Sequence, residues 1–234
     1  MADPNIYGFG HTDAIVSTET QHKVLRNTYW LLALSMIPSV FGAWIGVVTG
    51  FALFTATPPI LSVLAFLSIA FGFIFAIEKT KHCAIGVYVL LGFTFFMGLM
   101  LSRLLSFVLG FSNGASLIML AFGGTSVIFA IMATIATVSK KDFSGLGKWL
   151  VVGVLVLFLS SVANVFLQLP ALILTVSILA VIIFSAYILL DVQRIVKGGE
   201  KNYISATLMI YLDLYNVFTN LLTFLGIFSG NRNN

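Results

Sequence analysis

Two aspartates interrupt long apolar stretches near the end of the chain, where acidic residues are least expected. Asp191 lies in SAYILLDVQRIV and Asp213 lies in ATLMIYLDLYNVFTNLL. An ionised carboxylate at membrane depth is costly, and such residues usually face a bundle interior, pair with each other and mark a pathway for protons or ions. These two residues are therefore the first candidates for chemistry.

The spacing of the two acids predicts that they meet. The polar stretch KGGEKN at residues 197–202 separates the two apolar spans, and its Gly198 and Gly199 suit a tight reversal. If the chain turns at 200–202, each acid lies roughly 10 to 15 Å along its helix from the turn. Two antiparallel helices would then hold the carboxyl groups at a similar depth.

Polar residues share a face with each acid. At about 100° per residue, one stripe on the last span and one on the preceding span each cluster on a single side. The first stripe is Asp213, Asn216, Asn220 and Thr223, and the second is Ser177, Tyr187, Asp191 and Arg194. These stripes should face each other or a watery cavity. A simpler alternative is that Asp191 ends its helix and pairs with Arg194 at the membrane surface.

Composition sets the class of the protein. Hydrophobic residues make up 59% of the chain and charged residues only 9%, whereas soluble domains average about 25% charged residues. We expect an all-α, polytopic membrane protein, and we expect no nucleic-acid partner because the basic residues are spread over the loops. Seven apolar segments have about the length that crosses a bilayer. They span residues 28–50, 60–77, 83–103, 115–138, 149–167, 171–193 and 203–227.

The distribution of basic residues predicts the orientation. One set of loops contains Lys23, Arg26, Lys79, Lys81, Lys140, Lys141, Lys148, Arg194, Lys197 and Lys201. The opposite loops, at 51–59, 104–114 and 168–170, contain no lysine or arginine. Because cytoplasmic loops are enriched in these residues, the N-terminus should be cytoplasmic and the C-terminus external. This gives a cytosolic tail at 1–27, a membrane domain at 28–228 and a short external tail at 229–234.

The first span carries Gly42, Gly46 and Gly50 at intervals of four. Small residues at this spacing let two helix backbones approach closely. The stripe predicts close packing inside the protein, with a dimer interface as the alternative.

The sequence offers little support for an enzyme. It contains no HExxH, GxSxG or Walker motif, and His11, His22, His82 and Cys83 form no ligand pattern. Two membrane carboxylates also occur in aspartyl proteases, so an intramembrane hydrolase is an alternative, but no other active-site motif accompanies them. We therefore expect no enzymatic activity and no resident cofactor.

Several segments together resemble the Bax inhibitor-1 (TMBIM) family of seven-span membrane proteins. AYILLDVQRIV and YLDLYNVF match the two places where the family carries a pH-sensing aspartate pair. HKVLRNTYWLL, FLQLPAL and GGEKNYISAT are similar to the bacterial branch that modulates the membrane-anchored FtsH protease. The resemblance extends through most of the chain.

The resemblance implies a central seventh helix surrounded by the other six. It also implies that Asp191 and Asp213 are a pH sensor in a leak for calcium or other cations. The family's calcium leaks use an arginine in the second span as a latch, but residues 60–77 contain neither arginine nor lysine. Lys79 or Arg103 is the candidate substitute.

Two functions follow, and they can coexist. In the first, the cytosolic tail engages an FtsH-type protease in the bacterial inner membrane, and the protein modulates that protease. In the second, the acid pair gates a cation leak. Two neighbouring carboxylates should share a proton, and its loss would bias the bundle toward another packing. Calcium could then bind Asp191 and Asp213 weakly and transiently, with Asn216, backbone carbonyls and water completing its oxygen shell.

Overall fold

The computed structural model describes residues 9–51 and 59–230, with side chains for 19–51 and 60–229. Within these ranges the chain forms seven α-helices, and each is long and apolar enough to cross a membrane. Their bounds are α1 (Phe9–Thr49), α2 (Pro59–Thr80), α3 (Ile85–Leu109), α4 (Gly114–Val138), α5 (Leu146–Leu167), α6 (Pro170–Val196) and α7 (Tyr203–Gly230). The predicted all-α, seven-span fold is confirmed.

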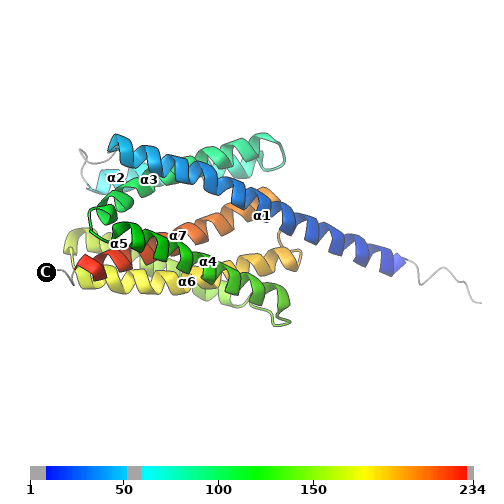
Figure 1. The fold of residues 1–234 in the computed structure, drawn as a ribbon. Coiled ribbons are helices and arrows are strands. Elements are labelled where there is room, and N and C mark those ends of the chain that lie inside the picture. The colour runs from blue at the N-terminus through cyan, green and yellow to red at the C-terminus, as the bar shows by residue number, and fades with distance from the viewer. Residues whose placement is uncertain (1–8, 52–58, 231–234) are drawn as a thin grey trace, which may run out of the picture.

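The first helix begins much earlier than the apolar pattern indicates. The sequence places the start of the first span near residue 28, whereas α1 begins at Phe9. Residues 9–27 contain no proline, so nothing in the backbone prevents the helix from continuing into polar sequence. Figure 1 shows the beginning of α1 projecting beyond the other six helices. Residues 1–8 and 231–234, the outermost parts of the two predicted tails, lie outside the described residues.

Helix α7 occupies the centre of the bundle, as expected. It packs against α6, α4, α1 and α3, and it touches α2 near one end (Figure 1). Helix α5 lies farther from α7 and packs on α6, while α2 packs mainly on α3. The six other helices therefore do not all surround α7, because α5 is separated from it by α6.

Hydrogen bonds join the middle of α7 to its neighbours. The Tyr211 hydroxyl lies 2.8 Å from Ser39 Oγ of α1 and donates to the Thr94 carbonyl of α3 at 3.4 Å. One turn later, the Tyr215 hydroxyl donates to the Met97 carbonyl at 3.3 Å. Tyr211 is among the largest fully buried side chains. These bonds satisfy polar groups that hydrocarbon would leave without partners.

Glycines bring α1 and α3 into backbone contact. A Cβ atom on Gly42 would collide with the Phe95 carbonyl, and one on Gly98 would collide with the Ser39 carbonyl. A Cβ on Gly46 would lie 2.5 Å from the Ser102 side chain. The glycine stripe of the first span therefore packs α1 against α3 inside the protein. Gly50 does not belong to this contact, since it follows the last residue of α1 with a φ of +62° and a Cβ atom on it would meet nothing within 4 Å.

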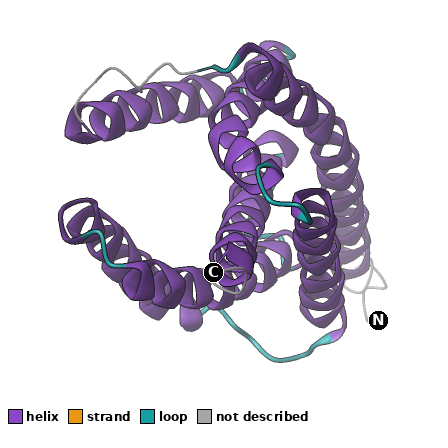
Figure 2. Ribbon diagram, turned by 60° about the vertical axis from the view of Figure 1, so that its left-hand side comes forward, coloured by secondary structure: helices purple, strands orange, loops and turns teal. Residues whose placement is uncertain are grey.

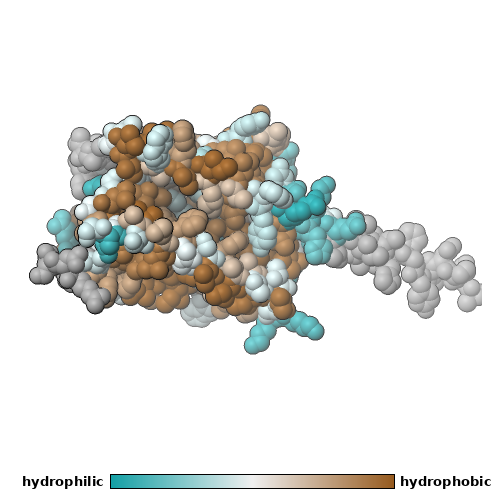
Figure 3. Space-filling model, in the orientation of Figure 1, coloured by the Kyte–Doolittle hydropathy of each residue, from teal (hydrophilic) through white to brown (hydrophobic). Residues whose placement is uncertain are grey.

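Apolar side chains cover most of the bundle's surface, as contact with lipid requires. Figure 3 shows brown, apolar side chains over the helices and teal, polar ones gathered where α1 projects. At that end lie the turns at 81–84, 139–145 and 197–202, which we call the basic end. Its turns carry Lys81, Lys140, Lys141, Lys197 and Lys201.

We expect Gly98→Ala to destabilise the protein by about 1–3 kcal/mol, because the new methyl group has to push the α1 backbone away. Thermal unfolding in detergent measures the loss. Gly72→Ala is the matched control, since nothing lies within 4 Å of a Cβ at Gly72 on α2. Equal midpoints for the two variants would contradict the close α1–α3 contact.

Candidate proton and cation site

The structure brings the two acids together between α6 and α7. Asp191 and Asp213 are 5% and 6% exposed, and their carboxyl groups are close enough to interact with each other. Gly198, with a φ of +74°, forms the reversal between the two helices, where the sequence predicts a turn. The hairpin therefore holds both carboxyl groups inside the protein.

One oxygen of the pair has no hydrogen-bond partner. Asp213 Oδ2 is buried, and no group among the described residues bonds to it. Two ionised carboxylates cannot bond to each other, because both offer only acceptors. A single proton on either group supplies the missing donor. The geometry therefore fits a pair that shares one proton.

Arg194 and Tyr187 of α6 flank the acids. Arg194 Nη1 lies 3.4 Å from Asp191 Oδ1, and the arginine side chain is 58% exposed. Tyr187 is close enough to both carboxyl groups and to Arg194 to interact with their charges. Asp191 thus makes both contacts considered from the sequence: it pairs with Arg194 and it also faces Asp213.

The structure does not bring the two candidate latch residues to the pair. Lys79 is exposed near the end of α2, and Arg103 is exposed in the last turns of α3, away from the basic end. Among the ion pairs between described residues, only Arg194 contacts either acid. The cation at this site therefore comes from α6 itself.

The amides of α7 follow Asp213 along the helix but do not bond to it. Asn216 donates to the Leu212 carbonyl and Asn220 donates to the Asn216 carbonyl, both at 2.8 Å. No cluster of three or more His, Cys, Asp or Glu side chains occurs among the described residues. Calcium takes six to eight oxygen ligands, so at this pair it would need further oxygens from amides, carbonyls or water.

Sequence reasoning missed Gln193, which is 2% exposed and holds the turn between α4 and α5. Its Oε1 accepts from the Phe143 N–H at 2.8 Å, and its Nε2 donates to the Lys141 carbonyl at 2.9 Å. Lys197 reinforces this turn through a 2.9 Å ion pair with Asp142. This hydrogen-bonded lysine holds the pKa of Asp142 below its ordinary value, and the Ser144 N–H adds to the effect. A glutamine near a helix end carries no sequence signal for this role.

A second missed contact fixes the start of α7. Ser205 Oγ donates to Glu78 of α2 at 2.8 Å, and Asn202 Oδ1 accepts from the N–H groups of Ile204 and Ser205. A carboxylate is favourable at a helix N-terminus, where the helix dipole is positive. Lys81 lies 2.6 Å from Glu78, and this hydrogen bond raises the pKa of Lys81.

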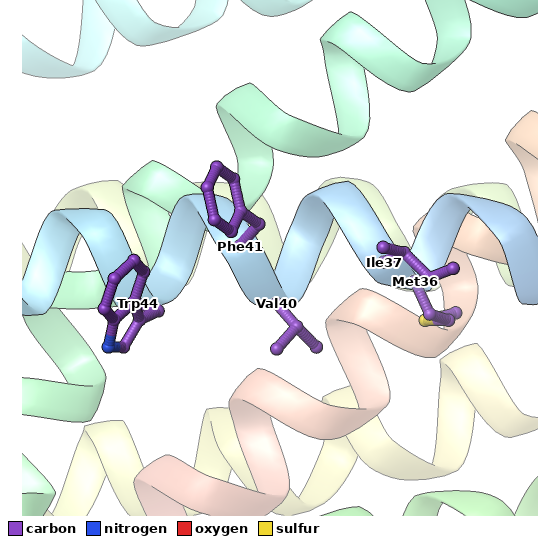
Figure 4. A pocket seen from close by; sticks show the side chains of 5 residues that line it. All are labelled: Met36, Ile37, Val40, Phe41 and Trp44. Carbon is purple, nitrogen blue, oxygen red and sulfur yellow. The ribbon is translucent and has the colours of Figure 1, made fainter.

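An open recess of about 420 Å³ lies elsewhere, along α1. Figure 4 shows its five lining residues, Met36, Ile37, Val40, Phe41 and Trp44, all on this helix. None of them is a candidate site residue. An apolar recess on the outer surface of a membrane span suits lipid tails rather than a polar ligand.

Comparison with known proteins identifies the family. The family described as "Inhibitor of apoptosis-promoting Bax1" matches residues 21–230, which covers most of the chain and includes both acids. The chain belongs to the Bax inhibitor-1 family. The family that the sequence resembles is therefore confirmed.

Three bacterial proteins similar to this Bax inhibitor-1 family member cover most of its length. "Modulator of FtsH protease YccA" of Escherichia coli K12 is 38% identical over 208 residues, 89% of this chain and 91% of the relative. "Inner membrane protein YccA" of E. coli O6:H1 has the same identity and coverage. "Uncharacterized membrane protein" of Vibrio cholerae is 34% identical over 223 residues, 95% of this chain and 97% of the relative. The similarity therefore extends over nearly the whole length of each protein.

Replacing Gln193 by alanine should cost about 1–3 kcal/mol, because the Phe143 N–H and the Lys141 carbonyl would lose their partner. The turn should also open, so trypsin should cleave faster after Lys140 and Lys141. Gln168→Asn is the control, because Gln168 is exposed and asparagine tolerates its left-handed backbone. Unchanged proteolysis in Gln193→Ala would show that other contacts hold the turn.

If the folded acid pair keeps a proton at pH values where the unfolded chain has lost it, the folded state binds more protons than the unfolded state. The free energy of unfolding should then fall as the pH rises, until the folded pair also loses its proton. One proton gives a slope of at most about 1.4 kcal/mol per pH unit. Asp213→Asn replaces the proton by an amide donor and should abolish this slope in thermal unfolding across pH. Asp142→Asn, at an exposed acid, should keep it. An unchanged slope in Asp213→Asn would exclude the shared proton.

Proposed function

We propose that this protein modulates a membrane-anchored FtsH-type protease in the bacterial inner membrane. The observation that carries the proposal is the 38% identity, over 89% of this chain, with a protein described as a modulator of that protease. The relatives' names describe modulators and membrane proteins rather than enzymes, which supports a role without catalysis.

The charge pattern supports a cytoplasmic location for the basic end and the N-terminus. The turns at the basic end carry Lys81, Lys140, Lys141, Lys197 and Lys201, whereas the turn at 110–113 and the turn at 168–169 carry no lysine. The projecting start of α1 would then point into the cytosol, where an ATP-driven protease can reach it.

The two parts of α1 differ in how firmly they are held. Beyond Gln21, which lies against Gly198, the helix extends away from the bundle, and an isolated helix this short is only marginally stable in water. Closer to the membrane, Thr207 of α7 donates to the Thr28 carbonyl, and Ser35 and Val24 are buried. A protease could unwind the projecting part readily and then meet a helix locked into the bundle. The protein would occupy the protease and slow degradation of other membrane proteins.

Deleting residues 2–18 tests this proposal. The deletion should abolish co-purification with FtsH and restore the degradation rate of a second FtsH substrate in cells that overproduce the protein. Asp213→Asn, which leaves the N-terminal segment intact, is the control and should still associate. Full modulation by the deletion variant would contradict the proposal.

A second candidate function is a proton-sensitive leak for calcium or other cations. It is favoured by one observation: Asp213 Oδ2 is buried without a hydrogen-bond partner among the described residues, on a carboxyl group that interacts with Asp191. A shared proton would hold α6 against α7, and its loss would create repulsion that favours an open packing. The unpaired acids could then attract a passing cation.

Calcium flux into liposomes containing the purified protein tests the leak. Flux should change with pH in the wild type, and the pH response should disappear in Asp213→Asn. Flux no greater than in empty liposomes at every pH would remove this candidate and leave the acids a structural role.

A further inference from the structure

One side of α7 is half-exposed from Met209 to Ile227. The residues on this side recur at intervals of three or four, so they form one straight seam. The seam consists of Met209, Leu212, Asn216, Thr219, Thr223 and Ile227, and all six are neither buried nor fully exposed. Asn220, also half-exposed, borders it.

The seam is open because the two outermost helices leave α7 uncovered. Helix α2 packs mainly on α3 and reaches α7 at its own last turns, where Glu78 accepts from Ser205. Helix α5 packs on α6. Figure 2 shows the bundle as an open ring, with these two helices as the separated arms on the left. The seam therefore faces the bilayer between α2 and α5.

The amides on this side of α7 are poorly suited to lipid. Exposed hydroxyls elsewhere, such as Ser68 and Ser126, bond to a carbonyl of their own helix, and this bond uses their one donor. An asparagine has two donor hydrogens and a carbonyl oxygen. Among the described hydrogen bonds, Asn216 and Asn220 each use only one side-chain N–H, on the carbonyl four residues earlier. The remaining polar atoms need partners.

Three occupants are conceivable, and the geometry favours one. Lipid tails offer no hydrogen bonds. Water in an opening that faces sideways would border hydrocarbon directly. A helix could satisfy the amides and separate them from lipid, and polar and small residues are what hold membrane helices together.

We propose that the seam is the docking site for a transmembrane helix of a partner protein, whose facing side carries small and hydrogen-bonding residues. The choice of FtsH as the partner to test rests on the proposed function. Asn216 and Asn220 supply the polar contacts, and the two threonines with the apolar residues at both ends of the seam supply the packing surface.

Photocrosslinking with co-produced FtsH tests the site. The photoreactive amino acid p-benzoylphenylalanine replaces Thr219 on the seam or, as control, Val152, which is 53% exposed on α5. The seam position should crosslink to a transmembrane segment of FtsH, located by mass spectrometry, and Val152 should give background only. No crosslink at Thr219, or equal crosslinks at both positions, would overturn the proposal.

Two double variants and a labelling experiment distinguish a docked helix from lipid or water at the seam. Asn216→Leu with Asn220→Leu should keep the wild-type unfolding midpoint but lose the Thr219 crosslink, whereas Ser68→Leu with Ser126→Leu should keep both. Labelling of Asn220→Cys by a membrane-impermeant thiol reagent, in a Cys83→Ser background with FtsH present, would show water at the seam and would overturn docking. The crosslink is scored independently of degradation. Modulation without the crosslink removes only the docking site, and the crosslink without modulation removes only the proposed function.

Discussion

Two carboxyl groups enclosed between α6 and α7 set the main constraint on this protein. Both are almost fully buried, and Asp213 Oδ2 has no partner among the described residues. Two negative charges buried side by side would be costly. One proton shared between the carboxyl groups would remove most of that cost, because it replaces repulsion by a hydrogen bond. If the pair shares one proton, as we propose, the packing of α6 on α7 depends on the protonation of a single site.

The surrounding contacts hold both helices in place on the faces that the acids do not occupy. Gln193 ties α6 to the α4–α5 turn, and Glu78 ties the start of α7 to α2. Farther along, Tyr211 and Tyr215 bond α7 to the backbone of α3. A change in charge at the acid pair is thus opposed by contacts on both helices, and any movement has to break some of them. The half-exposed side of α7 from Met209 to Ile227 is the exception, because none of the described helices covers it.

The sequence predicted the helices and the meeting of the acids because both depend on local patterns. Apolar length gives the spans, and the equal spacing of Asp191 and Asp213 from a glycine turn gives their contact. The start of α1 could not be found from the apolar pattern, because hydrophobicity marks the membrane span and not the helix, and polar residues 9–27 continue the same backbone. Gln193 and the Glu78–Ser205 contact could not be predicted, since they join segments whose relative positions only the packed bundle fixes. The latch role of Lys79 and Arg103 stays a prediction: neither forms an ion pair with the acids among the described residues, and the sequence could not show which cation the packed bundle brings to them.

Infrared spectroscopy can detect a protonated carboxyl group between α6 and α7. At neutral pH the wild type should show the carbonyl band of one buried carboxylic acid, and this band should be absent in Asp213→Asn and should vanish as the pH is raised. A wild-type spectrum without such a band at neutral pH would mean that both acids are ionised. The account of a shared proton between α6 and α7 would then be wrong.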